Sequence, residues 1–254
     1  MNIIYGTSES ETLVGTDDAD RILTYGGNDT VYGGDGDDEI NGYPTGEGED
    51  FYARWTYWDS ANELLIYGGY GNDFIIGGQS DDIIFGQSGA DVIKGDEGND
   101  LIYGGDDDDL ISGMEGNDIL YGGDGSDTIQ FGNGDNFVDG GNGNDRIGGY
   151  VTFRGQNSTV NWIFFAADNG TNTLYGGGGD DEIIGGPGGD TIYGGDGDDF
   201  LAGRDEGDYL DGQSGDDWLV GKGGDDTLVA GDGFDILNGG DGNDTYIINS
   251  RYFD

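Results

Sequence analysis

The chain contains no cysteine and no histidine. Without cysteine it forms no disulfide and performs no thiol chemistry. Without histidine it lacks zinc-protease motifs, histidine-based catalytic triads and imidazole acid–base catalysis. No stretch approaches about 18 consecutive apolar residues, so the sequence predicts no membrane-spanning helix. The N-terminus also lacks a basic region followed by an apolar run, which argues against a Sec-type signal peptide.

Basic residues are scarce. The chain has 8 Lys and Arg against 54 Asp and Glu, which gives a net charge of −46. A chain with this charge repels itself and stays disordered unless cations neutralise it. Nucleic acids and anionic membranes are polyanions and repel it too, so we expect neither as a partner.

One nine-residue phrase fills most of the chain: G-G-x-G-x-D-x-U-x, where U is a large aliphatic residue. It occurs as GGDGDDEIN from Gly33, GGDGSDTIQ from Gly122 and GGDGNDTYI from Gly239. We call each copy a nonad and number its positions one to nine. Because the copies follow one another directly, the sequence predicts a single quasi-linear array over 1–254.

The nonads form three blocks when they are aligned on the acid at position six. Four nonads fill 6–41, nine fill 68–148, and eight fill 176–247 within a third block that runs to 254. Position eight is aliphatic in 20 nonads, with Tyr246 the exception. Position six is Glu11 in one nonad and Asn136 in another. In the other 19 nonads it is aspartate: Asp20, Asp29, Asp38, Asp73, Asp82, Asp91, Asp100, Asp109, Asp118, Asp127, Asp145, Asp181, Asp190, Asp199, Asp208, Asp217, Asp226, Asp235 and Asp244.

Each half of a nonad predicts its own local structure. The glycine-rich half favours a turn, because glycine adopts backbone conformations that other residues resist. The last three residues form a short strand with one inward side chain. Two nonads then make one coil of 18 residues, and residues 18 apart stack about 4.8 Å from one another. Aspartates stacked at that spacing repel unless a cation lies between them, and calcium suits the place because it accepts six to eight oxygen ligands.

The repeat resembles the RTX, or haemolysin-type, calcium-binding repeat family over about three-quarters of the chain. The resemblance implies an all-β fold, a right-handed parallel β-roll, with calcium stacked along both edges. In that family each ion lies between successive turns of one edge, held by aspartates and carbonyls of the glycine-rich half. Carried over here, the 19 aspartates are the candidate metal ligands. Thirteen Asp–Asp pairs lie 18 apart, with Glu11–Asp29 and Asp118–Asn136 as weaker candidates. We expect about 12–15 calcium ions, with gaps in both edge rows at two interruptions of the array.

These interruptions, at 42–67 and 149–175, contain three of the four Trp: Trp55, Trp58 and Trp162. The aromatic side chains either pack over the roll, which we favour, or contact a glycan or protein partner. Residues 65–67 and 173–175 read as degenerate strands that return to the roll. If each interruption fills three nonad slots, both emerge on the same side, close to six coils or roughly 28 Å apart. A loop that takes two slots would put them on opposite sides.

Outward positions seven and nine form an apolar stripe in alternate nonads of the central block. The stripe comprises Ile83 and Phe85, Leu101 and Tyr103, Ile119 and Tyr121, and Phe137 beside Asp139. A contiguous exposed apolar stripe is typical of an interface. It is therefore a candidate surface for a homodimer or another protein partner.

The sequence favours a non-enzymatic, calcium-folded, secreted module with a structural, adhesive or extracellular binding role. The alternative is a protein that binds or modifies polysaccharide through the aromatic interruptions. No catalytic domain accompanies the repeats, and GQSG at Gly86 and Gly212 is not the G-x-S-x-G motif. Ice binding is excluded because position three carries no threonine row. The resemblance implies bacterial type I secretion to the medium or cell surface. Because NSRYFD shows no full secretion signal, either the chain is a fragment or its signal is very short.

Overall fold

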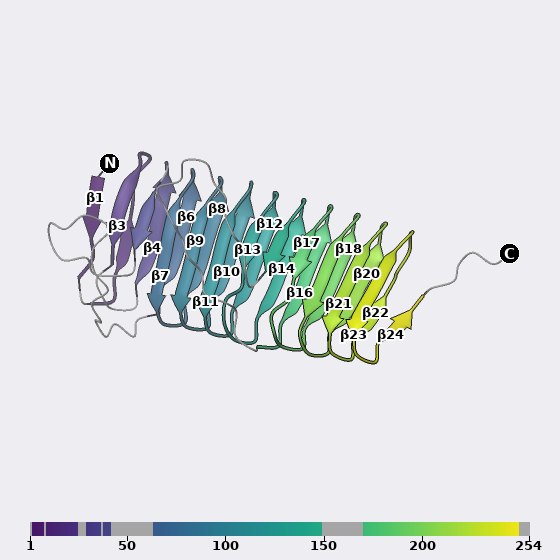
Figure 1. Cartoon of the computed structure of the whole chain (residues 1–254). Coiled ribbons are helices and arrows are strands. Elements are labelled where there is room, and N and C mark those ends of the chain that lie inside the picture. The colour runs from purple at the N-terminus through teal and green to yellow at the C-terminus, as the bar shows by residue number, and fades with distance from the viewer. Residues whose placement is uncertain are drawn as a thin grey trace, which may run out of the picture.

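A computed structural model describes residues 2–7, 9–24, 29–36, 38–41, 63–148 and 170–248. All regular elements in these ranges are strands, and they form two parallel sheets of twelve strands each. The sheets face one another along an elongated solenoid, with β1 at one end and β24 at the other (Figure 1). The prediction of an all-β parallel roll is confirmed.

Odd-numbered strands form one sheet, which we call sheet A, and even-numbered strands form sheet B. Sheet A consists of β1 (Asn2–Tyr5), β3 (Asp20–Leu23), β5 (Glu39–Asn41), β7 (Phe74–Gln79), β9 (Val92–Glu97), β11 (Leu110–Glu115), β13 (Thr128–Gln130), β15 (Arg146–Gly148), β17 (Glu182–Ile184), β19 (Phe200–Arg204), β21 (Trp218–Gly223) and β23 (Ile236–Asp241). Sheet B consists of β2 (Thr12–Val14), β4 (Thr30–Asp35), β6 (Leu65–Tyr70), β8 (Ile83–Ser88), β10 (Leu101–Asp106), β12 (Ile119–Asp124), β14 (Phe137–Asn142), β16 (Thr173–Gly178), β18 (Thr191–Asp196), β20 (Tyr209–Ser214), β22 (Thr227–Val229) and β24 (Thr245–Ile247).

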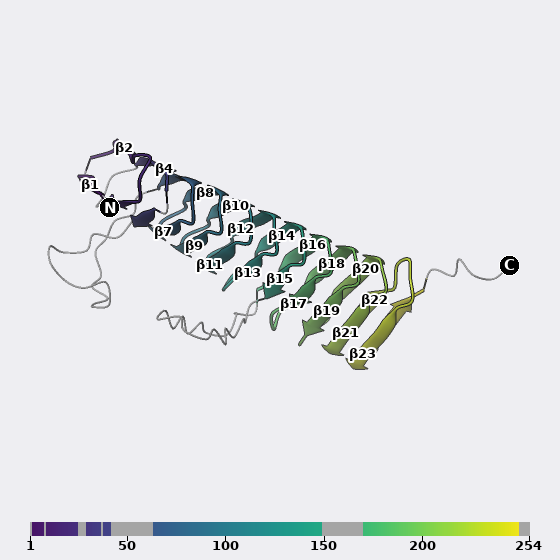
Figure 2. The same cartoon turned by 90° about the horizontal axis from the view of Figure 1, so that it is seen from above.

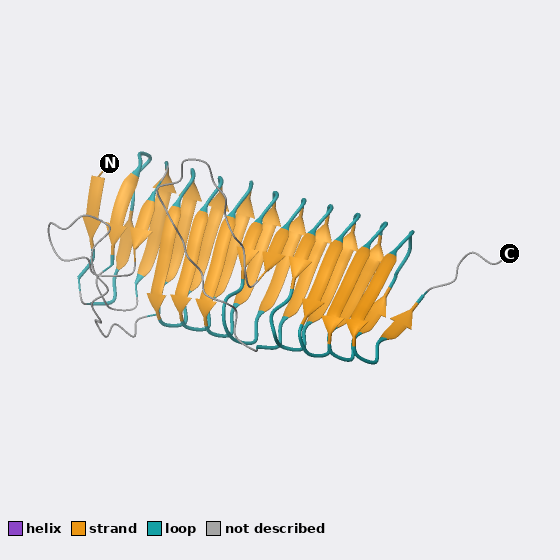
Figure 3. Cartoon of the chain, in the orientation of Figure 1, coloured by secondary structure: helices purple, strands orange, loops and turns teal. Residues whose placement is uncertain are grey.

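The chain alternates between the two sheets, so each coil contributes one strand to each layer (Figure 2). Within a block the register joins residues 18 apart, as in the pairing of Ile84 with Ile102 and of Ile102 with Leu120. We call the turns that lead from sheet B to sheet A the first edge. The turns that lead from sheet A to sheet B form the second edge. Strands and tight turns alternate regularly along both edges (Figure 3).

The core is a double column of position-eight side chains, one from each strand. Ile84, Ile102 and Leu120 are completely buried, and the same column continues through the solenoid from Leu13 to Leu228. Its last members, Leu237 and Tyr246, are less enclosed, and Tyr246 is 47% exposed. The interior therefore consists mainly of one aliphatic side chain per nonad, as the repeat predicts, with Leu64 and Phe131 as additional members.

Each interruption contributes one strand to sheet B. The 65–67 segment opens β6, which pairs with β4, and the 173–175 segment opens β16, which pairs with β14. The prediction of two returning strands is confirmed, but the prediction of three slots per interruption is wrong. An insertion within one turn preserves the strand register whatever its length, because strand pairing constrains only the residues that return to the sheet.

Both interruptions lie between a sheet A strand and the next sheet B strand, namely β5–β6 and β15–β16. Both breaks in the array therefore fall on the same edge, the second, while the predicted positions of the middle segments lie outside the described residues. In sheet A five pairing steps separate β5 from β15. The distance along the roll is then about 24 Å, so the expectation of six coils is wrong.

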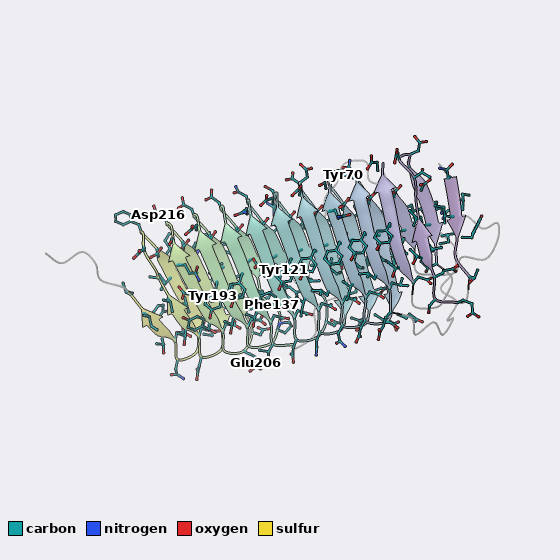
Figure 4. The ribbon with its side chains drawn as sticks, turned by 180° about the vertical axis from the view of Figure 1, so that it is seen from behind. Tyr70, Tyr121, Phe137, Tyr193, Glu206 and Asp216 are labelled. Carbon is teal, nitrogen blue, oxygen red and sulfur yellow. The ribbon has the colours of Figure 1, made fainter. Side chains whose placement is uncertain are left out.

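The outer face of sheet B carries a ladder of aromatic rings. Stacked pairs include Phe85–Tyr103 at 5.0 Å between ring centroids and Tyr103–Tyr121 at 4.7 Å. Where position nine is Asp139, the ring of Phe137 at position seven continues the ladder, at 5.8 Å from Tyr121. Tyr121, Phe137 and Tyr193 lie on this one face (Figure 4). Ile83 and Ile119 beside the ladder are 39% and 42% exposed, so the predicted apolar stripe is present on the surface.

Candidate metal centre

The position-six aspartates are buried at the two edges, at the start of each strand. Every one from Asp20 to Asp226 is at most 3% exposed. One carboxylate oxygen, Oδ1, accepts a hydrogen bond from the backbone N–H of the position-six residue one coil earlier. Asp100 Oδ1, for example, accepts from the N–H of Asp82 at 2.8 Å, and Asp127 Oδ1 accepts from the N–H of Asp109 at 2.8 Å. The aspartates thus link successive coils along each edge.

The second oxygen, Oδ2, is left without a hydrogen-bond donor in most of these side chains. Among the described residues, Oδ2 is buried and accepts no hydrogen bond in Asp29, Asp82, Asp91, Asp100, Asp109, Asp118, Asp127, Asp145, Asp181, Asp199, Asp208, Asp217 and Asp226. A buried carboxylate oxygen with no donor is strongly destabilising unless a positive charge compensates it. A repeated row of such oxygens therefore indicates a row of cation sites.

Glycine at position one leaves the space in which these oxygens meet. A Cβ at Gly122 would collide with Oδ2 of Asp127 and with the carbonyl oxygen of Gly140, and a Cβ at Gly104 would collide with Asp109 and Gly122 in the same way. The carboxylate of one turn and the backbone carbonyl of the next therefore border the same small space. Glycine stands at position one in 18 of the 21 nonads, and at Gly104 and Gly122 a Cβ would fill this space.

Burial and mutual repulsion of the edge aspartates raise their carboxylate pKa values. Burial raises the pKa of Asp100 to about 8, and the neighbouring carboxylates of Asp118 and Asp82 add to the rise, although the N–H of Asp82 opposes it. Burial likewise raises the pKa of Asp208 to about 8, and the carboxylates of Asp190 and Asp226 contribute. Stacked carboxylates cannot all ionise in this environment without a counter-charge.

The donor set fits calcium. Within the described residues, no three Asp or Glu side chains gather into a metal-binding cluster. A cation at an edge would therefore be held by aspartates of successive turns together with backbone carbonyls such as that of Gly140. Calcium accepts such mixed carboxylate and carbonyl oxygens in a flexible geometry, whereas zinc and other softer metals prefer Cys and His, which this chain lacks.

On the first edge the row of aspartates continues through both interruptions. The N–H of Asp38 donates to Oδ1 of Asp73, 35 residues later, and the N–H of Asp145 donates to Oδ1 of Asp181 at 2.6 Å, 36 residues later. The row of aspartates therefore has no gap on this edge, and the expected gaps in the calcium rows stay a prediction. A search for residues 18 apart cannot find these two pairs, because the insertions shift their spacing.

On the second edge three position-six residues are not acidic. Leu64 donates its N–H to Oδ1 of Asp82 at 2.7 Å, so it occupies the place of an aspartate. Asn136 and Asn172 stack on one another, with the N–H of Asn136 donating to Oδ1 of Asn172 at 3.1 Å. Asn136 is predicted from the sequence, but Leu64 and Asn172 are not, since both lie at the ends of the interruptions.

Position five forms a second row of hydrogen bonds between successive coils, which was not predicted from the sequence. Oδ1 of Asp198 accepts the N–H of Asp216 at 2.8 Å, and Oδ1 of Asn99 accepts the N–H of Asn117 at 2.9 Å. These side chains are exposed. Each accepts the N–H of the next coil, whereas each position-six carboxylate accepts the N–H of the preceding coil. The recurrence of Asp and Asn at position five is the sequence signal for this row.

The remaining predicted site residues lie either in the last coil of the roll or outside the described residues. Asp235 and Asp244 are only partly buried in the last coil, and their Oδ1 atoms accept the N–H groups of Asp217 at 3.0 Å and Asp226 at 3.2 Å. Trp55, Trp58 and Trp162 lie outside the described residues. Their predicted contacts with a ligand or partner stay predictions.

Fold and edges together define a parallel β-solenoid built to hold cations between its turns. A family model described as the RTX calcium-binding nonapeptide repeat matches residues 5–40, 65–93, 85–120, 94–129, 121–149, 166–201, 193–228 and 220–247. The chain belongs to this family, and it is a calcium-binding β-roll. A search of curated proteins found no match. Among the described residues, none forms a helix long and apolar enough to cross a membrane.

Proposed function

We propose that this chain is a secreted module that folds when it binds calcium and that has a structural, adhesive or extracellular binding role. The carrying observation is the row of buried Oδ2 atoms without donors at the edges of the roll. Calcium binding then contributes directly to folding, because the sites do not exist in the unfolded chain. The ligands are the 19 position-six aspartates, and the ions number about 12–15.

The test is far-UV circular dichroism of the full chain in a chelator and during calcium titration. We expect a largely unfolded chain in the chelator and a gain of β-structure with a midpoint of about 10⁻⁴–10⁻³ M, the range of extracellular calcium modules. Identical spectra in the two conditions would contradict the proposal.

Export is the second part of the proposal. RTX proteins are typically bacterial and secreted by a type I system, and the midpoint expected above matches calcium outside the cell. A cell that expresses the chain with its type I transporter should release it into the medium or onto its surface. Retention of the chain inside such a cell would contradict this part.

A polysaccharide-binding or polysaccharide-modifying protein is the second candidate. Three of the four Trp lie in the interruptions, and both interruptions leave the same edge of the roll. Replacing Trp55 and Trp58 with Ala separates the possibilities. Lost binding on a glycan array with unchanged calcium-loaded melting supports a ligand site. Lower melting, or conversion of a dimer to a monomer, supports packing of the aromatics or a homodimer through the apolar stripe.

A further inference from the structure

The two edges of the roll differ in their chemistry, although the same repeat builds both. On the first edge ten consecutive N–H to Oδ1 contacts join aspartate to aspartate from Asp20 to Asp235. On the second edge five contacts join aspartate to aspartate, within Asp82–Asp118 and within Asp190–Asp244. Leu64 precedes the first of these groups, and Asn136 with Asn172 separates the two.

The side chain of Leu64 has no oxygen that could bind a cation. Leu64 is 5% exposed and belongs to the hydrophobic core. Its backbone keeps the ladder intact, since its N–H donates to Asp82 at 2.7 Å and its carbonyl accepts the N–H of Ile83 at 2.9 Å. Burial of the apolar side chain and backbone hydrogen bonds thus join this coil to the next one.

At Asn136 and Asn172 the side-chain amide groups supply donors that the aspartates lack. Nδ2 of Asn136 donates to the carbonyl of Gly134 at 3.0 Å and to Oδ1 of Asn172 at 3.1 Å. Nδ2 of Asn172 donates to Oδ1 of Asp190 at 2.8 Å and to the carbonyl of Gly170 at 3.4 Å. The amide hydrogens therefore satisfy oxygens of the turn, as a cation would elsewhere.

Glycine is also absent from position one at this point. In the same nonad as Asn136, position one is Phe131, which is completely buried and packs in the core. At the matching place one coil earlier, Gly113 leaves room for Oδ2 of Asp118. A bulky side chain and an uncharged amide thus occur together where the repeat normally has glycine and a carboxylate.

We propose that the second edge contains two calcium-free joints, one at Leu64 and one at Asn136–Asn172. Calcium forms one continuous column on the first edge and separate groups on the second. Both Leu64 and Asn172 stand directly before the strand that returns from an interruption, β6 and β16. The joints therefore close the two turns that carry the interruptions without an ion, and this inference rests on the proposed calcium-dependent folding.

Native mass spectrometry of the full chain at saturating calcium tests the second joint. Asn172→Ala is compared with Asp208→Ala, which changes the same position on the same edge two coils later. We expect Asn172→Ala to keep the wild-type number of calcium ions and to melt several degrees lower, because turn oxygens lose their amide donors. We expect Asp208→Ala to lose one or two ions. Loss of ions in Asn172→Ala, or unchanged melting of that variant, would overturn the amide joint.

Calcium positions in crystals of the wild-type chain give a test that needs no variant. Anomalous scattering should place ions along the whole first edge. On the second edge it should place none between Leu64 and Asp82 and none between Asn136 and Asn172. A peak at either place would overturn the inference even if the chain folds with calcium as proposed. A wild-type chain that binds no calcium in either experiment would instead refute the proposed function.

Discussion

At the scale of single residues, the repeat assigns each position a separate physical task. Aspartate at position six uses Oδ1 to join coils and leaves Oδ2 at the edge, and glycine at position one leaves the space beside that oxygen. The two positions therefore border the same space. Phe131 and Asn136 change together in one nonad, whereas the nonads with Thr24 and Ala230 at position one keep aspartate at position six.

A pair of glycines in β16 tests this residue-level requirement. A Cβ at Gly176 would collide with Oδ2 of Asp181 and the carbonyl of Gly194, whereas a Cβ at Gly178 meets only Oδ1 of Asn142 at 3.7 Å. Gly176→Ala should lower the free energy of unfolding in calcium by about 1–3 kcal/mol, through overpacking and a damaged site. Gly178→Ala is the control and should change it by at most about 0.5 kcal/mol. Calcium-loaded denaturant unfolding measures both, and equal effects would contradict the argument.

The raised carboxylate pKa values predict opposite pH dependences with and without calcium. Burial raises the pKa of Asp109 and Asp145 to about 8, whereas an unfolded aspartate titrates near 3.9. Between about pH 4 and pH 8 the calcium-free roll therefore binds more protons than the unfolded chain. Its stability is greatest below pH 4 and falls as pH rises through this window.

Calcium requires the ionised carboxylates, so its binding releases those protons and its affinity rises over the same window. The midpoint of calcium-induced folding, followed by circular dichroism, should therefore fall to lower calcium concentration between about pH 5 and about pH 8. A midpoint that does not move with pH would contradict the assignment of these aspartates.

At the scale of strands, the aromatic ladder stabilises sheet B on its outer face. Tyr103 stacks on both Phe85 and Tyr121, with interplanar angles of 4° and 5°. Stacked rings cover one another's faces and present their edges to the solvent. The ladder is therefore better suited to holding successive coils in register than to stacking against sugar rings.

Tyr103→Ala removes two ring contacts and should lower the free energy of unfolding in calcium by about 1–3 kcal/mol, since each aromatic pair contributes about 0.5–1.5 kcal/mol beyond burial. Tyr70→Ala is the matched control, because Tyr70 is 67% exposed at the end of β6. It should shift stability by about 0.5 kcal/mol or less. Equal losses in the two variants would show that the ladder contributes nothing particular to stability.

At the scale of the whole molecule, the repeat predicts most of the architecture. The alternation of turn and strand, the 18-residue coil and the buried position-eight column follow from the nonad alone. The course of the chain through the interruptions does not follow, because it depends on which strand the returning residues pair with. The contacts Asp38–Asp73 and Asp145–Asp181 thus became visible only in three dimensions.

The Leu64 and Asn172 positions show the same limit for the site. Neither belongs to a recognisable nonad. Leu64 nevertheless stands in register with Asp82, and Asn172 stands in register with Asp190. The aromatic ladder was partly foreseen as an apolar stripe. The step from Tyr121 to Phe137 belongs to the predicted stripe, but its continuation to Tyr175 was not foreseen, since Tyr175 lies at the end of an interruption and the ladder there returns from position seven to position nine.

The net charge of −46 offers a second explanation for calcium-dependent folding, namely general screening of repulsion, and the two explanations predict different ion specificities. Sodium chloride screens exposed charges but supplies no ligand to buried Oδ2 atoms. Magnesium demands near-ideal octahedral geometry and keeps its waters, so it fits the mixed carboxylate and carbonyl edges poorly. Small-angle scattering should therefore show an expanded chain in chelator, in magnesium and in about 1 M sodium chloride. Only calcium should produce the elongated compact roll. A roll of the same dimensions in salt or magnesium alone would show that charge neutralisation, without ligation at the edges, is sufficient to fold the chain.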